Sequence, residues 1–85
     1  METVFDLATP EELKKIHGEC FDDADYERFR QYALEDPDCN NAMLASLYSI
    51  RGDMKRADSA VASIQDPESR LEAHFSIYGC THGAI

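Results

Sequence analysis

Apolar residues recur at three- and four-residue intervals along most of the chain, and polar residues fill the positions between them. This spacing places the apolar side chains on one face of a helix. Alternating runs of Val, Ile and Thr, which indicate strands, do not occur, and neither do the hairpin dipeptides Asn-Gly and Asp-Gly. The pattern therefore predicts an all-α fold.

Capping residues and helix breakers divide the chain into five short predicted helices. Thr9 can cap the first helix, Pro10 fits its first position, and Glu12 completes a capping box. Carboxylates suit helix starts in the same way, so Asp22 or Asp23 should cap the second helix, Asp38 the third and Asp53 the fourth. The predicted helices span residues 10–17, 23–34, 39–51, 54–65 and 67–78, in one domain of residues 1–85 with a tail at 80–85 after a stop at Gly79.

Each predicted helix carries an apolar stripe that should face a common core, because a chain of this length supports a single core. Gly18, Gly52 and the two Asp-Pro dipeptides separate these stripes. The predicted stripes are Leu13, Ile16 and His17; Phe29, Tyr32 and Ala33; Met43, Leu44, Leu47, Tyr48 and Ile50; Ala57, Ala60, Val61 and Ile64; and Leu71, Phe75 and Tyr78.

One internal period is visible. Asp36-Pro37 and Asp66-Pro67 are 30 residues apart, and at the same offset Ser46-Leu47-Tyr48 matches Ser76-Ile77-Tyr78. A helix breaker and a helix interior that repeat in register predict two successive helix-turn-helix units. Each unit would bury the apolar face that its neighbour leaves open.

Residues 41–67 resemble a tetratricopeptide-type helical repeat. The matching positions are Leu44-Ala45, Tyr48, Gly52-Asp53, Ala57, Val61 and Asp66-Pro67, whereas the larger Ile64 stands where the family has alanine. Asn41 stands where the family has tryptophan, and the closing proline comes about two residues early. The resemblance implies short antiparallel helices stacked as helix-turn-helix hairpins.

Members of that family are adaptors, and the resemblance also implies a concave face that holds a peptide or a partner helix. Carried over by position, Ser46, Ile50 and Glu72 are its partner-binding residues. The other positions on that face are Ala42, Ser49, Ser76 and Gly79. Because most of these side chains are small, the groove should be shallow and relatively neutral, and strong anchoring would need charge from elsewhere in the chain.

The net charge of −9 is unevenly distributed. Residues 1–42 hold twelve acidic and four basic residues, whereas residues 43–85 hold five and four. A field of this sign repels nucleic acid and anionic membranes and attracts basic surfaces. We therefore expect a protein partner with a basic surface, no direct nucleic-acid binding and no membrane binding. The densest acidic cluster, and a candidate partner-binding site, is Asp22, Asp23, Asp25 and Glu27.

Other chemistry for these residues is disfavoured by the pattern. The acidic cluster has neither a nucleophile nor an oriented histidine beside it, so capping and solvation explain it better than catalysis. It also lacks the glycine and the final glutamate of a calcium loop. Cys80-x-His82, even with Cys20 and His17 or His74 nearby, matches no established zinc spacing. We expect no enzyme activity, no metal and no cofactor.

Three cysteines without a paired motif favour reduced thiols in the cytoplasm. The N-terminal residues lack the basic and apolar regions of a secretory signal, and no apolar run is long enough to span a membrane.

Two functional hypotheses remain open. One is a small acidic protein-binding module, an adaptor or inhibitor that acts by stoichiometric contact and could form a homodimer through the helix at 67–78. The other is an anti-defence inhibitor of the phage type, an anti-CRISPR or anti-restriction protein, whose acidic residues imitate DNA phosphates. The near-neutral second half of the chain fits the second hypothesis less well.

Overall fold

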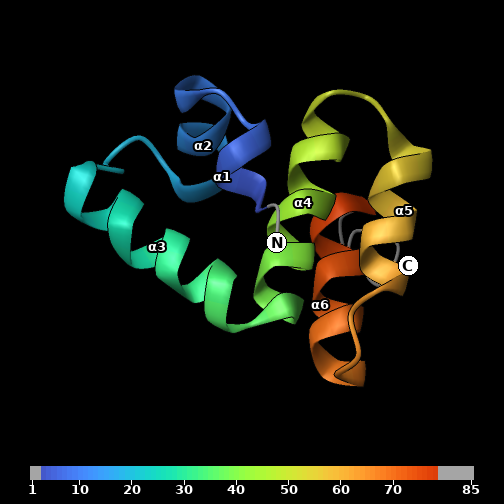
Figure 1. The fold of residues 1–85 in the computed structure, drawn as a ribbon. Helices are drawn as coiled ribbons and strands as arrows, with labels where there is room; N and C mark the ends of the chain where they lie inside the picture. Colours follow the sequence, from blue (N-terminus) through green and yellow to red (C-terminus); the bar gives the residue numbers. More distant parts are fainter. Residues whose placement is uncertain (1–2, 79–85) are drawn as a thin grey trace.

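The computed structural model describes residues 3–78 of the chain. These residues form six helices and no strand, which confirms the predicted all-α class (Figure 1). The helices are α1 (Val4–Leu7), α2 (Pro10–His17), α3 (Asp23–Glu35), α4 (Pro37–Ile50), α5 (Met54–Ala62) and α6 (Pro67–Tyr78). The predicted stop at Gly79 and the tail at 80–85 lie outside the described residues.

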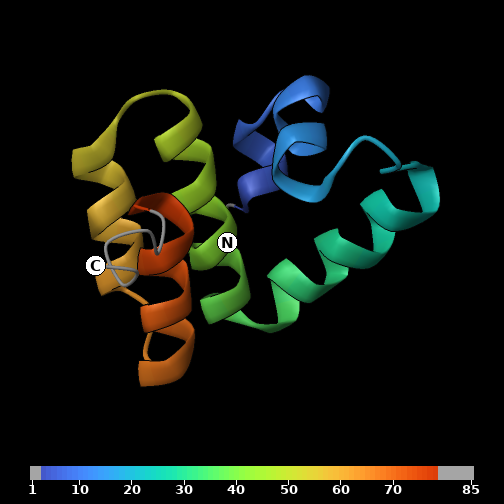
Figure 2. The same cartoon turned by 180° about the vertical axis from the view of Figure 1, so that it is seen from behind.

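Helix α4 is central and packs against each of the other five helices. From α4 onward the chain reverses twice, so that α4, α5 and α6 run in alternating directions (Figure 1). Helix α6 lies behind α4 and α5 in that view and in front of them from the opposite side (Figure 2). Helix α3 diverges from α4, and α1 and α2 lie between the two. Assignment of this arrangement to the tetratricopeptide-like superfamily stays a prediction.

The repeated Asp-Pro dipeptides begin α4 and α6. Asp36 is the single residue between α3 and α4, and its carboxylate accepts the Asp38 N–H at 3.0 Å. The Asp66 carboxylate likewise accepts the Ser69 N–H at 2.9 Å, with Pro67 as the first residue of α6. The cap of α4 is therefore Asp36 rather than Asp38, and the helix begins at Pro37, two residues before the predicted start. Proline is suited to this position because it has no N–H to leave unpaired.

Asp38 instead joins two parts of the fold. Its two carboxylate oxygens accept the backbone N–H groups of Gln65 at 2.9 Å and Asp66 at 3.1 Å. These contacts hold the loop between α5 and α6 against the first turn of α4. The N-termini of α4 and α6, 30 residues apart in sequence, are thereby fixed beside each other.

Helix α1 was not predicted, because four residues are too few for a periodic pattern. Its local signal is Thr3-x-x-Asp6, in which the Asp6 carboxylate accepts the Thr3 N–H at 2.8 Å. Val4 is completely buried, and its N–H donates to Oδ1 of the buried Asn40 at 2.8 Å. The first residues of the described chain are therefore part of the core.

The helix predicted at 54–65 ends earlier, at Ala62. The N–H of Ser63 donates to the carbonyl groups of Ser59 and Ala60, and its hydroxyl also donates to Ser59, at 2.9 Å. Serine competes with helix continuation through such bonds. Ile64 is nevertheless almost fully buried, as a loop residue rather than a helical one.

The core consists of two clusters that share α4. One joins α1, α2, α3 and α4, and the other fills the junction of α4, α5 and α6. The buried members of the first are Val4, Phe5, Leu13, Ala33, Met43 and Leu47; those of the second are Ala45, Ala60, Val61, Ile64 and Ala73. Small side chains dominate the second cluster and let its helices approach closely.

Five residues predicted to be buried are exposed: Tyr32, Ile50, Leu71, Phe75 and Tyr78. Tyr32 is exposed because α3 diverges from α4, and Ile50 because it is the last residue of its helix. Helix α6 packs through Ala73 and the half-buried Ile77 instead of its larger side chains. A helix with apolar residues on several faces can bury the face of small residues when that allows close packing.

Candidate partner-binding surfaces

A groove of about 500 Å³ follows one side of α4. Helix α4 supplies its floor, α6 one wall and the end of α2 the other wall, and Asp36 and Asp38 at the start of α4 lie at one end. Its polar lining consists of the carboxylates of Asp36, Asp38 and Glu72 and the hydroxyls of Ser46, Ser69 and Ser76. The remaining lining is mainly small or apolar, so a polypeptide segment could approach the floor closely.

The groove is electrostatically negative at neutral pH, so the expectation of a relatively neutral groove was wrong: Asp36 and Asp38 join Glu72 in its lining. In the described part of the chain its lining includes no lysine or arginine. Asp66, which caps α6 next to this groove, has a pKa below its ordinary value because the Ser69 N–H and hydroxyl donate to it. Carboxylates gathered in a concave site concentrate their field, so the groove attracts cations more strongly than a flat acidic surface does.

His17 forms part of the wall opposite α6. Its imidazole stacks against the rings of Phe21 and Phe29, with centroid distances of 4.8 and 4.6 Å and nearly parallel planes. Burial lowers the pKa of His17, and the nearby Asp25 charge opposes that shift. The imidazole is therefore neutral at pH 7 and adds no cation to the groove. Its Nε2 atom is enclosed and has no hydrogen-bond partner among residues 3–78.

Cys39 also lines the groove and is half-buried. Burial raises the pKa of its thiol, and the charge of Asp36 adds to the effect. A thiol that stays protonated is a poor nucleophile and a poor metal ligand. Cys39 therefore contributes shape to the groove rather than reactivity.

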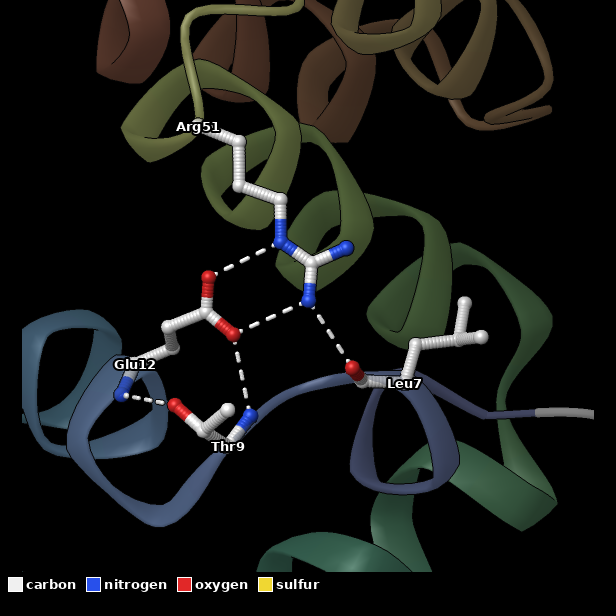
Figure 3. A network of polar contacts seen from close by, with 4 residues as sticks. All are labelled: Leu7, Thr9, Glu12 and Arg51. Carbon is white, nitrogen blue, oxygen red and sulfur yellow. Dashed lines mark hydrogen bonds and ion pairs between the residues drawn. The ribbon is translucent and has the colours of Figure 1, made fainter.

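A network centred on Arg51 holds α2 against α4 (Figure 3). The Nε of Arg51 donates to Glu12 Oε2 at 2.8 Å, and its Nη2 donates to Glu12 Oε1 and to the Leu7 carbonyl, both at 2.9 Å. Glu12 also accepts the Thr9 N–H at 2.9 Å. The Arg51 guanidinium is the main reason that the pKa of Glu12 falls to about 2. This network fixes the position of α2 and therefore of the His17 wall.

The predicted partner-binding residues lie in three separate places. Ser46 and Glu72 both line the groove, Ser46 from α4 and Glu72 from α6. Ile50 does not line the groove and is exposed at the end of α4. The acidic cluster of residues 22–27 lies at the start of α3, at the far end of the molecule from α6 (Figure 1).

That acidic cluster is partly committed to helix capping. Asp22 accepts the Asp25 N–H at 2.9 Å, and Asp25 pairs with Arg28. Asp22 and Asp23 border a second hollow of about 400 Å³, whose apolar lining includes Tyr26. The cluster therefore both stabilises α3 and adds negative charge near a small apolar surface.

The groove residues that the sequence did not predict include His17, Asp36 and Asp38. They belong to α2 and to the α3–α4 junction, whose placement depends on the Arg51 network and on the divergence of α3. Asp36 was noted as a breaker and Asp38 as a cap, but neither role indicates a groove wall. No local signal identified them as neighbours of Glu72.

Among residues 3–78, no three His, Cys, Asp or Glu side chains are grouped closely enough to hold a metal ion. The candidate zinc ligands Cys80 and His82 lie outside the described residues. No helix in the described part of the chain combines the length and the apolar character that crossing a bilayer requires.

Comparisons of the chain with protein-family models, with curated proteins and with solved structures found no match.

Proposed function

We propose that this chain is a small acidic protein-binding module, an adaptor or inhibitor that acts by stoichiometric contact, and that the groove beside α4 holds a basic segment of its partner. The supporting observation is the groove itself. It combines the carboxylates of Asp36, Asp38 and Glu72 with small side chains and has no lysine or arginine in its described lining.

The lining favours an extended segment that carries lysine or arginine. The small serine and alanine side chains on the floor and on the α6 wall allow a backbone to approach, and the serine hydroxyls can form hydrogen bonds with it. A lysine or arginine on that segment can reach Glu72 on one wall or Asp36 and Asp38 at the end. The net charge of −9 steers such a partner over a longer range, and the acidic start of α3 adds to this field.

Charge reversal at Glu72 tests the proposal, with Glu68 as the matched control. Both residues are exposed on α6, one turn apart, but only Glu72 lines the groove. The partner is first captured from an extract of the source cells, and its affinity is then measured by isothermal titration calorimetry. We expect Glu72→Lys to weaken binding about tenfold or more and Glu68→Lys to have a much smaller effect. Equal effects of the two variants would place the partner elsewhere and refute the groove as its site.

Competition with duplex DNA separates this proposal from DNA mimicry. A partner that binds through the groove should be retained when DNA is added. Displacement by DNA would favour the inhibitor that imitates phosphates, and capture insensitive to salt would count against any electrostatic mechanism.

A further inference from the structure

Helix α6 exposes a stripe of large apolar side chains. Leu71 is 54%, Phe75 38% and Tyr78 42% exposed. Their spacing of four and then three residues places them on one face of the helix. Leu71 also borders a hollow of about 500 Å³ between α5 and α6, with Val61 and Ala62 among its lining. Asp58, Arg70 and His74 also line this hollow, so the stripe and the hollow form one mainly apolar surface with polar groups at its margin.

We propose that this surface is a homodimer interface, in which α6 packs against α6 of a second copy of the chain. The inference does not depend on the groove, because the groove and the stripe lie on different faces of α6. Ser69, Ala73 and Ser76 line the groove, whereas Leu71, Phe75 and Tyr78 do not.

The distribution of charge identifies a second copy as the occupant. Residues 54–78 contain four acidic and three basic residues, whereas the remaining residues contain thirteen and five. Two copies with a net charge of −9 each repel one another if they approach through the acidic half. They can approach at little electrostatic cost over α5 and α6. A strongly basic partner, in contrast, is drawn toward the acidic half by the same field.

The stripe is self-complementary in an antiparallel arrangement. A twofold axis near Phe75 places Leu71 of one copy against Tyr78 of the other, and the same contact occurs twice. The Tyr78 hydroxyl donates to Asp58 of its own chain, so its ring can be covered without leaving a polar atom unpaired. Such a contact closes on itself and gives a dimer rather than a filament.

The test is sedimentation velocity from micromolar to millimolar concentration, in a reducing buffer so that the exposed Cys20 cannot cross-link copies. We expect the natural protein to shift from monomer to dimer and Phe75→Glu to raise the dissociation constant about tenfold or more. Leu34→Glu is the matched control, because Leu34 is 40% exposed on α3 and its replacement by glutamate adds the same charge as Phe75→Glu. Circular dichroism checks the fold of each variant. Leu71→Ser is a second test variant, because Leu71 is the most exposed of the three stripe residues.

Three outcomes would overturn the proposal: a monomer at all concentrations, equal weakening by Leu34→Glu, or association beyond the dimer. Salt distinguishes this inference from the proposed function. Added salt should tighten the dimer, because it screens repulsion between two acidic copies, and should weaken binding of a basic partner. Either proposal can therefore fail while the other holds.

Discussion

Replacement of Asn40 by alanine tests whether the N-terminal residues are an integral part of the core. Asn40 Oδ1 accepts the Val4 N–H at 2.8 Å, across 36 positions of sequence. Val4 has no exposed surface and Asn40 is 4% exposed. Alanine has no acceptor to offer, and the surrounding core leaves water little access to the freed N–H.

The magnitude follows from the cost of an enclosed donor that has lost its partner, which is about 1–3 kcal/mol. The shorter side chain also leaves a small void, which adds to the loss. A chain of this length has a total free energy of unfolding of roughly 4–13 kcal/mol. A single substitution should therefore remove a substantial share of the stability.

Urea denaturation followed by circular dichroism measures the change. With a dependence of about 1–3 kcal/mol per molar urea, we expect the midpoint to fall by roughly 1 M. Asn41→Ala is the control, because Asn41 is the next residue of α4 and is only half-buried; we expect a change within about 0.5 kcal/mol. If Asn40→Ala unfolds at the same urea concentration as the control, the bond between α1 and α4 does not stabilise the fold and the reasoning is wrong.

Two further predictions concern pH. The pKa of Glu12 lies at about 2 instead of its ordinary 4.5, so its stabilising effect is complete above pH 4.5 and is lost as the pH falls toward 2. The stability advantage of the natural protein over Glu12→Gln in urea denaturation should shrink across that range, and an advantage that stays constant would disprove the role assigned to the Arg51 pair. Burial lowers the pKa of His17 below 6.5 in the folded protein, so the unfolded chain binds a proton there more readily. The free energy of unfolding should therefore fall as the pH drops from 6.5 toward the pKa of the folded state. His17→Phe keeps a ring stacked against Phe21 and Phe29 but cannot titrate, so the variant should lose this dependence; an unchanged pH profile would exclude His17 as its source.

Helix starts were the most predictable feature of the fold. Thr9, Asp22 and Asp53 cap α2, α3 and α5 through bonds from backbone N–H groups three residues ahead. Such bonds depend only on neighbouring residues, so the sequence pattern is sufficient to find them. Asp36 and Asp38 show the limit of this approach, because two carboxylates compete for one cap and a tertiary contact with the α5–α6 loop decides between them.

The buried face of α6 could not be found in the same way. Apolar residues occur on several faces of this helix, so periodicity selects no single face. Close packing against α4 and α5 favours Ala73, whereas the pattern favoured the larger Phe75. Ser46 and Glu72 were placed on one face through the family resemblance, but His17 became their neighbour only through the tertiary position of α2.

The two core clusters explain why the groove depends on the whole fold. The cluster of α1, α2 and α3 positions the His17 wall, and the cluster of α5 and α6 positions the Glu72 wall. Both clusters pack on α4. The hydrogen bonds of Asp38 connect the α5–α6 loop to α4, and the Arg51 network connects α2 to α4. A partner segment bound to both walls would add a direct link between the clusters. Because such a segment binds the folded state and not the unfolded state, the free energy of unfolding rises with the logarithm of the partner's concentration. Partner binding and domain stability are for this reason coupled through α4, even though none of the residues that line the groove belongs to α5.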